Sequence, residues 1–70
     1  MNFVVSFQQS GAETLEPQVD QLAEAHGLDE VNRMFGMGTV DIELSGSREA
    51  VFAFVDAAAQ LDGVHCTEQP

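Results

Sequence analysis

The chain has 70 residues, which allows a single domain (residues 1–70) with a core near the lower size limit for a folded protein. Twelve acidic residues against two arginines and no lysine give a formal net charge of −10 at pH 7. This charge excludes direct binding to nucleic acid or to an anionic membrane surface, and the expected partner is a protein with a basic surface.

The composition also limits where the chain can work. Its single cysteine excludes an internal disulfide. No apolar run approaches the roughly 18 residues that a membrane span requires. No basic stretch precedes an apolar one near the start, as a signal peptide would need. We therefore expect a cytoplasmic protein that contacts no membrane.

The first predicted element is a strand from Asn2 to Gln8. Its side chains alternate, as those of a half-buried strand do. The residues expected to face the core are Phe3, Val5 and Phe7. A loop from Gln9 to Glu13 follows, because a serine–glycine pair interrupts the pattern.

A helix is predicted next, from Leu15 to about His26, with Thr14 as its N-cap. A start at Ser10 is rejected, because it would place Pro17 deep in the helix, where proline removes a hydrogen bond. Gly27 is the expected residue after the helix end. The helical residues expected to face the core are Leu15, Val19, Leu22 and Ala23.

A second strand from Val31 to Phe35 is predicted, although its alternation is imperfect. The segment Gly36–Gly38 suits the turn of a hairpin. The third strand, Thr39–Leu44, alternates without an error. Its apolar face consists of Val40, Ile42 and Leu44, and its polar face of Thr39, Asp41 and Glu43.

The second helix is predicted to begin after Ser47, its N-cap, and to continue to Leu61 before Gly63. Its apolar residues recur at helical spacing, which indicates one stripe packed on the sheet: Val51, Phe54, Val55, Ala58 and Leu61. A last strand, Val64–Glu68, is expected to turn Val64 and Cys66 inward, and Gln69–Pro70 forms the tail.

The predicted order is thus β-α-β-β-α-β. This order favours an α+β ferredoxin-like sandwich, with one four-stranded antiparallel sheet and both helices on one face through right-handed crossovers. The other face is expected to be open and able to dock a partner. Its predicted residues are Val4, Ser6, Met34, Asp41, Glu43, His65 and Thr67.

Residues that could carry catalysis are few. The loop after the first strand has no arginine to hold a phosphate. Cys66 is expected to be a small core residue rather than a nucleophile. His26, His65 and Cys66 have no recognised zinc spacing. The pair Asp41 and Glu43 has neither cleft nor partner. We therefore expect a protein that is not an enzyme and holds neither metal nor cofactor.

Four acids follow one edge of the first helix at spacings of three, four and four residues: Glu13, Glu16, Asp20 and Glu24. Four helical residues rise about 6 Å, which approximates every second phosphate of one DNA strand at roughly 3.4 Å each. No cation is expected on this face. The ridge is either a solvated helix face or a mimic of nucleic acid, with Asp41 and Glu43 as secondary contacts.

Three segments resemble the peptidase inhibitor I9 family, the propeptides and inhibitors of subtilisin-like proteases. The similar segments are Phe3–Phe7, the glycine-anchored strand Gly38–Leu44 and the last element, Gly63–Glu68. The resemblance implies that the C-terminal tail lies in a protease cleft as a product would. That role would fall to Thr67, Glu68, Gln69 and Pro70.

Three hypotheses for function follow. The first is an acidic inhibitor that docks on the nucleic-acid-binding surface of a basic protein, as small phage anti-CRISPR proteins do; this is an analogy from size and charge. The second is an I9-like inhibitor of a serine protease. The third is a regulatory module that self-associates through its open sheet face or edge strands. We prefer the first hypothesis. The protein itself is expected to be a monomer or a weak dimer.

Overall fold

The computed structural model describes residues 1–68, and its elements follow the order β-α-β-β-α-β. A short 3-10 turn (Gln9–Gly11) joins the first strand to the first helix. The strands and helices are β1 (Asn2–Gln8), α1 (Ala12–Ala25), β2 (Asp29–Gly36), β3 (Thr39–Ser45), α2 (Arg48–Ala58) and β4 (His65–Glu68). The predicted α+β class and element order are confirmed.

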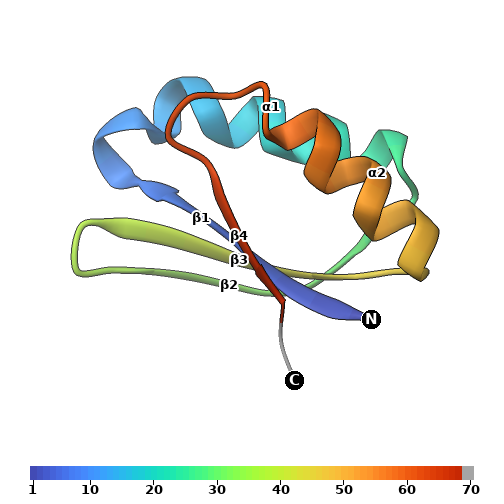
Figure 1. The fold of residues 1–70 in the computed structure, drawn as a ribbon. Helices are drawn as coiled ribbons and strands as arrows, with labels where there is room; N and C mark the ends of the chain where they lie inside the picture. Colours follow the sequence, from blue (N-terminus) through green and yellow to red (C-terminus); the bar gives the residue numbers. More distant parts are fainter. Residues whose placement is uncertain (69–70) are drawn as a thin grey trace.

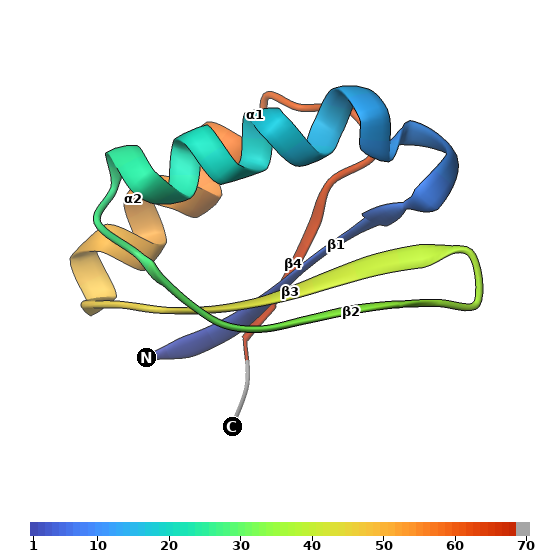
Figure 2. The same ribbon diagram turned by 180° about the vertical axis from the view of Figure 1, so that it is seen from behind.

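The strands form one antiparallel sheet in the order β2-β3-β1-β4, so β2 and β4 are its edges. Both helices lie on the same face of the sheet, and no other part of residues 1–68 covers the opposite face (Figure 1, Figure 2). Val5 of β1 pairs with Ile42 of β3 on one side and with Cys66 of β4 on the other. This is the predicted ferredoxin-like sandwich.

The core lies between the sheet and the helices. The sheet contributes Phe3, Val5, Phe7, Val40, Ile42 and Leu44, and the rest of the buried cluster is Val19, Ala23, Leu28, Val51, Phe54 and Ala58. The ring of Phe54 lies 5.4 Å from that of Phe3, centroid to centroid. No polar or charged side chain is buried among the described residues. The fold is therefore held by apolar packing, and every charge lies at the surface.

The predicted start of α1 is wrong. The helix begins at Ala12 with Gly11 as N-cap, and not at Leu15 after Thr14. The preceding 3-10 turn already brings the chain into a helical conformation, so Thr14 is not the extended residue that an N-cap requires. Pro17 therefore lies inside the helix, and the carbonyl four residues before it has no helical N–H partner.

The end of α1 agrees with the prediction that Gly27 follows it. Gly27 has a φ of 70°, in the left-handed region that glycine adopts without steric cost. Its N–H donates to the Glu24 carbonyl at 3.1 Å, and the N–H of Leu28 donates to the Ala23 carbonyl at 2.9 Å. These two bonds form a Schellman motif.

Within residues 1–68, no helix is long and apolar enough to cross a membrane.

The predicted start of α2 is confirmed, because the Ser47 side chain accepts a hydrogen bond from the Ala50 N–H at 3.1 Å. The helix ends at Ala58, however, and not at Leu61. The N–H of Leu61 donates to the carbonyl three residues earlier, at 2.9 Å. The chain therefore tightens into a 3-10-type turn before β4, and Leu61 still packs on the core from that turn.

Strand β2 is longer than predicted and begins at Asp29. Its register with β3 shifts between Glu30 and Asn32, so Val31 is an extra residue in a bulge. The bulge explains the imperfect alternation of the sequence, because one inserted residue changes the face of those after it. Strand β4 begins at His65, one residue later than predicted.

Two phenylalanines of α2 differ in burial, so their replacement by alanine is expected to lower the free energy of unfolding by different amounts. Phe54→Ala removes a fully buried ring and is expected to lower the free energy of unfolding by about 3–5 kcal/mol. Phe52→Ala removes a ring that is 49% exposed, and less than about 1 kcal/mol is expected. Denaturant unfolding followed by circular dichroism measures both. Equal losses would contradict the observed orientation of α2.

Candidate functional site

The predicted acidic ridge on α1 lies beside the one arginine of β2. Arg33 pairs with Ile42 of β3, so its side chain leaves the sheet on the face that the helices cover. Because β2 is an edge strand, the side chain is not buried in the core and reaches the outer side of α1. It is 20% exposed.

Three carboxylates surround the Arg33 guanidinium. Nη1 donates to Glu16 at 2.5 Å, and Nη2 donates to Asp20 at 2.7 Å. Glu30, three residues earlier on the same strand, accepts from Nη2 at 2.5 Å and from Nε at 3.3 Å. One cation thereby connects the middle of α1 to the edge of the sheet. We call Arg33 with these three acids the Arg33 cluster.

The expectation that no cation lies on this face of α1 is wrong. The hydrogen bonds to Asp20 and then to Glu30 raise the pKa of the Arg33 guanidinium above its ordinary value, so it remains charged. Arg33 pairs with both acids in the middle of the ridge, although one cation against three carboxylates leaves the Arg33 cluster a net charge of −2. Sequence spacing along the helix gave no signal of this pairing, because the partner is 13 to 17 residues away on a strand.

The two ends of the ridge differ from its middle. Glu13 and Glu24 are exposed, and no cation of the described residues lies within ion-pair distance of either. Eleven helical residues separate them, which corresponds to about 16 Å along the axis. The ridge is therefore two separate carboxylates on either side of the Arg33 cluster, rather than a continuous row.

The secondary acids, Asp41 and Glu43, lie on the open face of the sheet. Both are half-buried, and each accepts a hydrogen bond from β1. The Ser6 hydroxyl donates to Asp41 Oδ1 at 2.6 Å. Asn2 Nδ2 donates to Glu43 Oε2 at 3.2 Å. These donors restrict the rotamers of the two carboxylates, which leaves less side-chain entropy to be lost on binding.

The predicted site residues therefore do not form one surface. The acids of α1 belong to the helical layer, which covers one face of the sheet (Figure 1, Figure 2). Asp41 and Glu43 alternate along β3 with buried residues, so they lie on the opposite face. The alternation of β3 requires this, since Val40 and Ile42 are buried beneath the helices. A flat partner can contact one set or the other, but not both.

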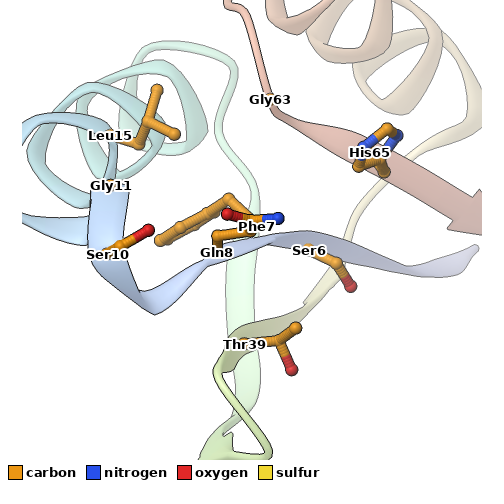
Figure 3. A pocket seen from close by; sticks show the side chains of 9 residues that line it. All are labelled: Ser6, Phe7, Gln8, Ser10, Gly11, Leu15, Thr39, Gly63 and His65. Atoms are coloured by element: carbon orange, nitrogen blue, oxygen red, sulfur yellow. The ribbon is translucent and has the colours of Figure 1, made fainter.

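A pocket of about 370 Å³, which the sequence analysis missed, lies at the end of β1. Its walls come from β1, the 3-10 turn, the start of α1, the start of β3 and the segment that leads into β4 (Figure 3). No local pattern of the sequence indicates this pocket, because its lining comes from segments far apart in the chain. The polar side chains of the lining are Ser6, Gln8, Ser10, Thr39 and His65.

The arrangement of these polar groups differs from that of a nucleophilic site. A catalytic serine donates its proton to a base that a third group orients. Here the Ser6 hydroxyl donates to Asp41, and no hydrogen bond among residues 1–68 joins it to His65. The lining contains no arginine or carboxylate. The pocket thus offers hydroxyl and imidazole groups that are not organised for proton transfer.

Cys66 lies in β4 beside Val5 and is half-buried against the core, as predicted. Burial raises the pKa of the Cys66 thiol, which disfavours the reactive thiolate. No group of three or more His, Cys, Asp or Glu residues within residues 1–68 is placed to hold a metal ion.

Compared with models of protein families the chain matches none, and its comparison with curated proteins also gives no match. The I9 resemblance therefore remains a prediction from the segments quoted above. Of its tail residues, Thr67 and Glu68 are paired with β1 in the sheet, opposite Val4 and Phe3. Gln69 and Pro70 lie outside the described residues.

The Arg33 cluster predicts a salt-dependent contribution to stability. Arg33→Gln should lower the free energy of unfolding by about 1 kcal/mol at low salt, and the loss should shrink as salt screens the three remaining carboxylates. Arg48→Gln is the matched control. It changes the net charge equally, but Arg48 lies over the Phe52 ring at 5.2 Å and has no carboxylate partner among the described residues.

Urea unfolding of both variants at several salt concentrations measures this difference. Equal losses for the two arginines would show that only net charge matters, and that the Arg33 cluster adds nothing of its own.

The Cys66 thiol predicts a loss of stability at alkaline pH. Its raised pKa means that the folded chain retains the proton above about pH 8.5, where an unfolded thiol loses it. The free energy of unfolding then falls as pH rises through this range. Cys66→Ala has no thiol to titrate, so its stability difference from the wild type should narrow between neutral and alkaline pH. A difference that stays constant would contradict this prediction.

Proposed function

We propose that this protein is a non-catalytic inhibitor that occupies the basic, nucleic-acid-binding surface of a partner protein. One observation carries the proposal. Nine of the twelve carboxylates have no cation within ion-pair distance among residues 1–68, and none of the twelve is buried. A surface with this excess of negative charge attracts a basic protein and repels nucleic acid.

The open sheet face is the better of the two candidate contact surfaces. Asp41 and Glu43 are two residues apart on a strand, a distance of about 6.7 Å. This spacing is close to the axial distance between every second phosphate of one DNA strand, about 6.8 Å. Hydrogen bonds from Ser6 and Asn2 already orient the two carboxylates. On α1, by contrast, the two carboxylates at the centre of the row are already paired with Arg33.

Two double variants assign the contact. Asp41→Asn with Glu43→Gln neutralises the open face, and Glu13→Gln with Glu24→Gln neutralises the ends of the α1 ridge. The control is Asp56→Asn with Asp62→Asn, an equal charge change at two exposed positions in and after α2. Each immobilised variant is used to capture proteins from nuclease-treated cell extract at low salt.

We expect the wild type to capture a nucleic-acid-binding protein, which double-stranded DNA and high salt both displace. The open-face variant should retain about a tenth of it or less, and the control should retain most. No capture, or capture that resists both DNA and salt, would refute a nucleic-acid mimic. Equal losses of capture in all three variants would show that binding depends on the total negative charge and not on one surface.

A further inference from the structure

Of the six large apolar side chains that are exposed among residues 1–68, four lie on β2 and the hairpin that follows it. The exposed fractions are 54% for Val31, 61% for Met34, 59% for Phe35 and 102% for Met37. Met37 also has a φ of 57°, in the left-handed region where Asn or Gly would cost less. Neither packing nor turn geometry explains four apolar residues here. Exposed apolar groups of this kind mark contact surfaces.

From Val31 onward, β2 and the hairpin after it carry no acid. Residues 31–40 contain no Asp or Glu, although the chain has twelve. The only charge in the segment belongs to Arg33, and three carboxylates hold it against α1. A basic partner would gain no attraction here, whereas a second copy of the chain would meet the least repulsion.

The backbone of β2 is free to pair. Within residues 1–68, the backbone of β2 pairs with no strand other than β3, so β2 forms an edge of the sheet (Figure 1, Figure 2). Its outer side presents backbone N–H and C=O groups that no strand pairs with. The Arg33 N–H donates instead to Oδ1 of the neighbouring Asn32 at 2.9 Å, so pairing with a second strand must replace this bond. No lysine or proline lies on this edge, and after the bulge at Val31 residues 33–36 keep a regular register with β3.

We propose that β2 is a self-association site, at which two copies pair antiparallel through their β2 edges and form an eight-stranded sheet. Opposite residues of an antiparallel pair share a face, so helix-side residues must meet helix-side residues. Centring the two-fold axis on Met34 satisfies this rule. It places Met34 against Met34, Phe35 against Arg33 and Met37 near Val31 of the second copy, which covers all four exposed apolar residues.

The same register keeps the acids apart. Glu30 of one copy lies opposite Gly38 of the other, and Asp29 lies opposite Thr39. Asp41 of β3 pairs with Met34, so it lies one strand further from the contact. The two Asp41 side chains of the dimer are therefore separated by three strand spacings, about 14 Å. This exceeds the screening length of about 8 Å at physiological salt. Pairing centred on Glu30 would instead bring carboxylates face to face.

The dimer is expected to be weak and to strengthen with salt. Seven residues of each copy, 31–37, form the contact in this register, fewer than the roughly 20–30 residues that each partner contributes to a standard interface. Each copy carries a net charge of −10, whose repulsion salt reduces. This salt dependence is opposite in sign to that of binding to a basic partner. The two proposals therefore fail independently.

Sedimentation velocity over a protein concentration series, at low and at high salt, tests the proposal. The wild type should form a dimer whose apparent Kd falls roughly tenfold or more from low to high salt. Met34→Glu places two carboxylates against each other and should leave a monomer at every concentration. Phe52→Glu makes the same charge change at an exposed apolar residue of α2 and should keep the dimer.

Two results would overturn the proposal. One is a wild type that stays monomeric at high salt and high concentration. The other is a dimer that Met34→Glu leaves intact, which would place the contact elsewhere. Circular dichroism confirms that each variant is folded, and both substituted side chains are largely exposed.

Discussion

Arg33 is the contact on which the arrangement of charge in this protein depends. A chain with a net charge of −10 repels itself, and its buried core is entirely apolar. The apolar stripe of α1 fixes which side of the helix faces the sheet, because Val19 and Ala23 are buried there. The fork of Arg33 to Glu16 and Asp20 then joins the helix to the β2 edge, because a guanidinium holds carboxylates in a defined geometry.

With Arg33 held against its three carboxylates, two other regions of the surface differ in charge and polarity. The open face of the sheet presents Asp41 and Glu43 already oriented by donors from β1. After the bulge, the β2 edge presents apolar side chains without any acid, and Glu30, just before the bulge, is turned toward Arg33. One region suits a basic partner and the other a neutral one. The acidic residues are spread over the whole sequence, but the folded chain has two different kinds of surface.

The fold could be predicted from the sequence because strand and helix periods differ, and the alternation of β3 is uninterrupted. One boundary of each helix, the end of α1 before Gly27 and the start of α2 after Ser47, was predicted as well. The other two could not be predicted, because a 3-10 turn starts α1 before Thr14 and another ends α2 before Leu61. The candidate site could be predicted from the sequence only in part. Spacing along α1 aligned the acids but could not show that Arg33, displaced by the bulge at Val31, reaches them. Tertiary pairing of this kind has no local signature.

The most direct test of this account is a double-mutant cycle between Arg33 and Asp20, with Arg33→Gln and Asp20→Asn measured singly and together. Equilibrium unfolding at low and high salt gives the coupling free energy. The account predicts a favourable coupling of about 1 kcal/mol at low salt that diminishes at high salt. A coupling of zero at low salt would contradict it, because the guanidinium would then organise neither α1 nor the β2 edge.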